Sequence, residues 1–119
     1  KTDSHCENYN TQAKIRPPLR SSEDIDFLTK ALKNNDIDLL TSLHSPKSYL
    51  NKDTSFDDAS FGTSTIDILM PLYYTYLIKT NIINYEQLFK LVASNPANIT
   101  KKNSGKIEVG YQANLILFN

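Results

Sequence analysis

The sequence lacks an excess of charge of either sign and has almost no cysteine. Its 13 basic residues equal its 13 acidic residues, so the formal net charge is zero. We therefore expect no general electrostatic attraction to nucleic acid or to an anionic membrane. Cys6 is the only cysteine, which excludes an internal disulfide and fits a reducing, cytoplasmic compartment.

Long hydrophobic runs and a secretory leader are also missing. No apolar run approaches the roughly 20 residues that span a bilayer, and residues 1–5 do not resemble a signal peptide. The chain starts in polar sequence without methionine, so we expect it to be a piece of a longer protein. Its 119 residues, of which 39% are hydrophobic, suffice for one modest domain with a packed core.

Start signals and apolar spacing predict a first and a second helix. The first follows Ser21 or Ser22, either of which can cap it, and it ends at 34–35. The second should run over about 64–79, with a kink or a late start caused by Pro71.

A third helix is predicted from Asn84, which can cap it while Gln87 completes a capping box. Asn95 and Pro96 should break this helix, and Pro96 can open a short further turn at its first position. The prolines near the end of residues 1–20 forbid a helix there and favour an extended segment.

Three segments have the composition of short strands. They are 37–43, which is mostly apolar, then 106–110 and 114–118, which flank a turn at Gly110. A long polar loop covers 45–62, and loops of this length in compact domains are often functional. The order of predicted elements indicates an α/β fold.

Four short motifs follow one another along the chain. They are 14–20 (KIRPPLR), 38–46 (DLLTSLHSP), 59–62 (ASFG) and 94–97 (SNPA). The last motif is followed by 105–107 (GKI), 109–110 (VG) and 113–115 (ANL). Together they resemble the C-terminal third of dihydroorotases of the larger, bacterial and multifunctional-enzyme type, over nearly all of residues 8–119. The end of the last block resembles amidohydrolases generally.

The resemblance implies a metal-bearing TIM (β/α)8 barrel and a small β-sandwich built from both chain ends. Residues 1–100 would then be the C-terminal portion of the amidohydrolase barrel, and 101–119 the terminal strands of the composite sandwich. The family's cofactor is zinc, and its ligands would lie mainly upstream of Lys1, so we expect no metal site in this chain. The adjacent His5 and Cys6 lack a second cluster and do not suggest one.

Leu43 is the main departure from the family pattern, which reads Thr-Asp-His-Ala-Pro where this chain has Ser-Leu-His-Ser-Pro over 42–46. In the family the aspartate would bind metal and move the proton from the attacking hydroxide to the departing amide nitrogen. That work needs an ionisable oxygen ligand, and leucine has none. We therefore predict that the chain contributes no catalytic residue.

Four residues match the family's substrate contacts and are predicted as a residual binding site. They are His44, Arg16, Ser60 and Gly62. His44 matches a histidine that contacts the substrate carboxylate, and Arg16 replaces an asparagine. Each has a simpler interpretation: a hydrogen-bonded histidine, a surface arginine, or ordinary turn residues. Lys47 stands where the family often has a further histidine.

Two functions from different classes fit these observations, so enzymatic status stays open at this stage. The preferred hypothesis is a non-catalytic dihydroorotase homologue of pyrimidine biosynthesis, which by resemblance can serve as a structural partner of aspartate carbamoyltransferase. The alternative is an active zinc-dependent cyclic amidohydrolase with an altered metal site. The expected partners are the N-terminal remainder of the same protein, the transferase, and a second copy in a homo-oligomer.

Overall fold

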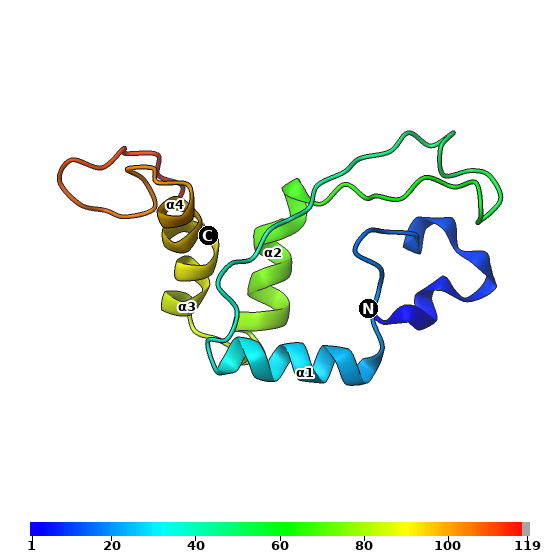
Figure 1. Ribbon diagram of the computed structural model, residues 1–119, viewed down its shortest axis with the longest axis horizontal. Helices are drawn as coiled ribbons and strands as arrows, with labels where there is room; N and C mark the ends of the chain where they lie inside the picture. The colour runs from blue at the N-terminus through cyan, green and yellow to red at the C-terminus, as the bar shows by residue number, and fades with distance from the viewer. Residues whose placement is uncertain (118–119) are drawn as a thin grey trace.

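The structure, a computed structural model, describes residues 1–117 as short helices joined by irregular segments (Figure 1). The α-helices are α1 (Ser22–Lys33), α2 (Leu69–Tyr73), α3 (Tyr85–Phe89) and α4 (Asn95–Ile99). There are also two π turns, η4 (Tyr74–Ile78) and η5 (Lys90–Ser94). Three 3-10 segments are η1 (Asp3–Tyr9), η2 (Thr11–Ala13) and η3 (Ile66–Ile68).

The molecule is elongated. Its Cα radius of gyration is 16.8 Å, whereas a compact chain of this length would have about 13.5 Å. Figure 1 shows why: α2, α3 and α4 gather on one side, the N-terminal segment and the loop over 45–62 lie on the other, and α1 runs between them.

Helix α1 begins where its cap was predicted. The Ser21 side chain accepts a hydrogen bond from the backbone N–H of Asp24 at 3.1 Å, which satisfies one of the free donors of the first turn. Asp24 also pairs with Arg20 at 3.2 Å. The helix ends at Lys33, and Asn35 follows with a φ of 62°, so the predicted end at 34–35 is confirmed.

The predicted helix over 64–79 starts late. Residues 66–68 form the 3-10 turn η3, α2 begins at Leu69, and Pro71 lies in its first turn. First-turn N–H groups have no partner inside a helix, so a proline costs little there. The π turn η4 then continues the helix, which adjusts its pitch rather than ending.

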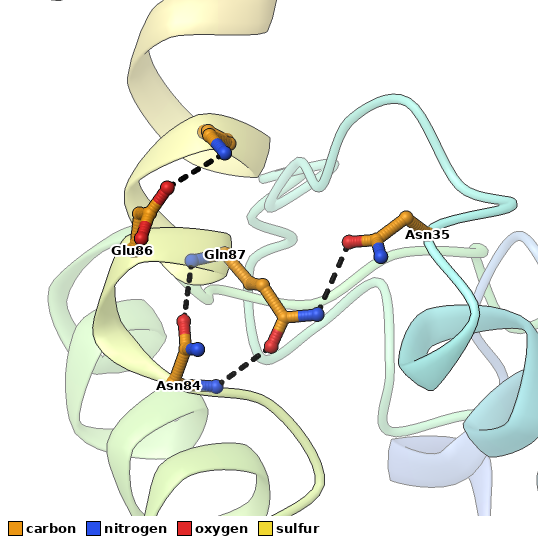
Figure 2. Close-up of polar contacts among 5 residues, drawn as sticks. Asn35, Asn84, Glu86 and Gln87 are labelled. Carbon is orange, nitrogen blue, oxygen red and sulfur yellow. Dashed lines mark hydrogen bonds and ion pairs between the residues drawn. The ribbon is translucent and has the colours of Figure 1, made fainter.

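Helix α3 has the predicted capping box, shown in Figure 2. The Asn84 side chain accepts from the Gln87 backbone N–H at 2.8 Å, and the Gln87 side chain accepts from the Asn84 backbone N–H at 3.0 Å. The Gln87 amide also donates to Asn35 at 3.1 Å. The start of α3 is thereby tied to the turn that follows α1.

The predicted break at Asn95 and Pro96 is wrong. The backbone stays helical from α3 through η5 into α4, and Pro96 lies in the first turn of α4. The wide π turn η5 leaves room where the proline ring would otherwise meet the carbonyl of the preceding turn. The Asn95 side chain donates to the Asp38 carbonyl at 2.7 Å, which anchors the junction.

The strand predicted at 37–43 does not form. A strand needs a neighbour whose backbone pairs with it along a ladder, and these residues lie against helices instead. The Leu40 N–H donates to the Leu91 carbonyl at 3.0 Å, and the Tyr73 hydroxyl lies 3.4 Å from the Thr41 carbonyl. The segment is extended but not paired as a strand.

The strands predicted at 106–110 and 114–118 are likewise not formed in the part of the chain that the structure describes; Phe118 lies outside it. Apolar side chains here are almost fully exposed, as at Val109 and Leu117. Extended apolar segments pair only when another strand edge is present. The division of the chain at residue 100 stays a prediction.

Residues 16–20 contain no helix, as their prolines predicted, and η1 and η2 both end before them. The small core lies elsewhere, among the helices. Ile83, Leu88 and Leu91 are its buried members. Partly buried side chains pack around them from α1, α2, η4, η5 and the segments between: Leu32, Ile37, Leu40, Met70, Tyr73, Leu77, Ile78, Ile82 and Val92.

Candidate functional site

Leu43 occupies the position predicted to have lost its catalytic acid. Its φ is 45°, in the left-handed region, and 54% of its surface is exposed. Leucine gains no packing from such exposure, and a branched side chain is strained in this backbone conformation. Aspartate and asparagine adopt the same conformation more readily. The backbone at Leu43 is therefore of the kind that suits aspartate, although the side chain has no oxygen.

His44 is engaged by the backbone of a neighbouring turn. Its Nδ1 accepts hydrogen bonds from the N–H groups of Thr65 at 3.0 Å and Ile66 at 3.2 Å, just where η3 begins. Those bonds require the Nδ1 lone pair, so the ring proton is on Nε2. The imidazole acts as a cap for η3, which is the simpler of the two predicted interpretations.

Both ends of the loop over 45–62 meet beside His44. The Ser45 N–H donates to the Thr63 carbonyl at 3.0 Å, and the Thr65 hydroxyl donates to the Ser42 carbonyl at 2.9 Å. These contacts close the base of the loop, in which Ala59 is buried.

Ser60 and Gly62 belong to the turn that closes this loop. The Ser60 N–H donates to the Asn51 carbonyl at 3.0 Å, and the Gly62 N–H donates to the Lys14 carbonyl at 3.2 Å. Gly62 has a φ of 135°, and an added Cβ would overlap the Ser45 carbonyl oxygen. Glycine is required here, and the backbone N–H groups of both predicted residues are already bonded within the protein.

Arg16 joins the same turn through an aromatic ring. Its guanidinium carbon lies 5.6 Å from the ring centre of Phe61, and the Nζ of Lys14 lies 4.6 Å from that centre. Cations at these distances are attracted by the ring face. The structure thus brings Arg16, Ser60 and Gly62 together around Phe61, while His44 faces the start of η3.

Two lysines that sequence reasoning did not single out hold this region together. Lys14 is 9% exposed and Lys52 is 4% exposed. Burial, followed by repulsion from Lys14 and Lys47, lowers the pKa of Lys52 below its ordinary value. Lysine is rarely buried, so the sequence does not predict that these two side chains are. The place of Lys14 in the motif over 14–20 was the only feature that pointed to it.

The arrangement does not fit a metal ion. No group of three histidine, cysteine, aspartate or glutamate side chains comes together within residues 1–117. Leu43 offers no ligand, the Nδ1 of His44 is committed to backbone N–H groups, and the Asp58 carboxylate accepts from Ser55 at 2.7 Å. What these residues offer is hydrogen bonding and positive charge. Within the same residues, no helix is both long and apolar enough to cross a membrane.

The chain is similar to curated proteins over nearly its whole length. It is 36% identical to the dihydroorotase of Ruminiclostridium cellulolyticum over 118 residues, which are 99% of the chain and 28% of that protein. It is 37% identical to a probable dihydroorotase-like protein of Helicobacter pylori (strain 26695), over 97% of the chain and 30% of that protein. The chain thus spans less than a third of these relatives. No protein-family model matches it.

Solved structures show the same backbone arrangement. The L-hydantoinase (dihydropyrimidinase) from Arthrobacter aurescens superposes with a TM-score of 0.88 at 24% identity, over 95% of this chain and 26% of that one. A D-hydantoinase (dihydropyrimidinase) from a Thermus species superposes with a TM-score of 0.76 at 23% identity, over 87% and 24%. At these identities the likeness concerns the fold alone.

The family follows from the curated relatives, which match nearly the whole chain. The chain is a segment of a dihydroorotase-type amidohydrolase.

Proposed function

We propose that the chain belongs to a non-catalytic dihydroorotase-like protein of pyrimidine biosynthesis. The observation that carries this proposal is Leu43, an exposed leucine on backbone suited to aspartate. A hydrolytic site of this kind needs an oxygen ligand for the metal and a base for the proton, and leucine supplies neither. The role of His44 as a backbone cap supports the same conclusion.

An active cyclic amidohydrolase is the competing function. The name of the Ruminiclostridium cellulolyticum relative, dihydroorotase, favours it. An enzyme would need a substitute for the missing acid, and Asp57 and Asp58 are two carboxylates that the loop offers. The Asp58 carboxylate accepts a hydrogen bond from the Ser55 hydroxyl, and the Asp57 backbone carbonyl accepts one from the Lys14 ammonium. These contacts favour the non-catalytic function.

We further propose that the protein acts as a structural partner of aspartate carbamoyltransferase. Departures from the family pattern fall at Arg16, Leu43 and Lys47, whereas the helix caps and the core support a complete scaffold. Large apolar side chains, among them Phe27, are exposed on the described chain and could be covered by a partner. A function carried by the surface explains a preserved frame around an altered site.

Co-expression tests the partnership. We expect the full-length protein and the transferase to elute together in size-exclusion chromatography at micromolar concentration, because a specific interface buries about 1,200–2,000 Å². Each protein run alone at the same concentration is the control. Separate elution of the two, with a transferase that is stable and fully active alone, would contradict the scaffold role.

A further inference from the structure

Lys14 and Lys52 cross-link two segments that are far apart in the sequence. The Lys14 Nζ donates to the carbonyls of Phe56 at 2.7 Å and Asp57 at 2.9 Å, both in the loop. In the opposite direction, the Lys52 Nζ donates to the carbonyls of Thr11 at 3.0 Å and of Lys14 itself at 2.8 Å. Each lysine therefore reaches into the segment that carries the other.

Both ammonium groups are buried without a carboxylate partner. The ion pairs formed within residues 1–117 are Arg20 with Asp24 and Lys90 with Glu86, and neither involves these lysines. Burying an unpaired charge is costly. Charge-assisted bonds to four carbonyls offset that cost, and so does the position of Lys14 over the rings of Phe56 and Phe61.

The two ammonium groups also repel each other. Lys14 and Lys47 both disfavour the charged form of Lys52, in addition to burial. Hydrogen bonds from both ammonium groups to backbone carbonyls hold the two segments together against this repulsion. Such an arrangement can open when a few bonds are lost, without disturbing elements outside it.

The hydrogen bonds of the turn at 60–62 depend on the same contacts. The carbonyl of Lys14 accepts from both the Lys52 ammonium and the Gly62 N–H. The ring of Phe61 lies under the Lys14 ammonium. Releasing either lysine therefore loosens the acceptor or the ring that positions this turn. The core around Leu88 contains no residue of the loop or of the N-terminal segment.

We propose that Lys14 and Lys52 form a reciprocal lock, and that the loop over 45–62 opens and closes against residues 11–16 as one unit. In the closed state the lock fixes Ser60, Phe61 and Gly62 beside Arg16. In the open state this surface is released while α1 and α3 remain folded. The lock is a property of the fold and does not depend on the function proposed above.

Hydrogen exchange of the full-length protein tests the lock without any substitution. In low concentrations of urea, the amide of Gly62, which bonds across to the Lys14 carbonyl, is expected to exchange with a lower opening free energy than core amides in α3. An opening free energy at Gly62 equal to that of the α3 amides would overturn the proposal.

Substitutions test the reciprocity. We expect Lys14→Met and Lys52→Met each to speed exchange at Gly62 by at least about tenfold, because a hydrogen bond to a charged group contributes more free energy than a tenfold change in an equilibrium constant requires. The double variant should add little to either single one, because one lost link releases both. Lys33→Met, at the exposed end of α1, is the matched control and should change nothing. Unchanged exchange in the lysine variants, fully additive effects, or an equal rise in α1 and α3 would refute the lock.

Discussion

Replacing Leu88 with alanine is expected to destabilise the protein by about 2–5 kcal/mol, the usual cost of cutting a buried leucine back to alanine. Leu88 is 2% exposed and lies at the centre of the core. Because whole domains are stable by only about 5–15 kcal/mol, a large part of the folded population should be lost. Urea unfolding followed by circular dichroism measures the change.

Leu50→Ala is the matched control for this substitution. Leu50 is 81% exposed and lies in the loop, so the same change in side chain should alter the free energy of unfolding by no more than about 0.5 kcal/mol. A loss below about 1 kcal/mol for Leu88→Ala, or equal losses for the two variants, would show that the core is not where the structure puts it.

Gly62→Ala should be the most damaging change in the candidate site. The φ of 135° lies in a region that essentially only glycine adopts, which alone costs about 1–3 kcal/mol for another residue. The new Cβ would also overlap the Ser45 carbonyl and lie 3.1 Å from the Lys47 Cε. Because the overlap is with backbone, the loop base itself must move. Urea unfolding and hydrogen exchange at Ser60 should both register it.

Gly110→Ala is the control that separates the cost of the backbone conformation from the cost of a steric clash. Gly110 has a φ of 90°, but nothing lies within 4 Å of an added Cβ. It should therefore show only the conformational cost, about 1–2 kcal/mol or less. Equal destabilisation by the two substitutions would mean that the close approach between Gly62 and Ser45 is not real.

Helix starts could be predicted from the sequence because their causes are local. Ser21 and Asn84 accept from N–H groups three residues ahead, and Gln87 completes its box within the same turn. Such signals need no knowledge of the rest of the chain. The effect of Pro71 was also predictable, since a proline inside an apolar pattern moves the helix start.

Strands and long helices could not be predicted in the same way. The segment 37–43 has the composition of a strand, but a strand exists only when a neighbour offers a ladder, and here Leu40 bonds to a helix. Pro96 failed as a helix breaker because the π turn η5 before it changes the pitch. Both outcomes depend on contacts made elsewhere in the chain.

The arrangement of the candidate site could not be predicted from the sequence. The motif alone predicts the loss of an acid at Leu43, and this stays a prediction. That His44 caps η3, and that Lys14 and Lys52 are buried, follows only from the folded backbone. Lysine and histidine are usually found near water, so nothing in their spacing announces a structural use.

Steady-state turnover of the full-length protein, supplied with zinc, tests the central claim most directly. If Leu43 stands in place of the metal ligand and proton carrier, as we propose, hydrolysis of dihydroorotate and cyclisation of carbamoyl aspartate should both be slower by at least about 10²–10⁴-fold than in an active enzyme. The dihydroorotase of Ruminiclostridium cellulolyticum, assayed in parallel, is the control. The account predicts no turnover above the uncatalysed background; turnover above about 1 s⁻¹, ordinary for an enzyme, would contradict it.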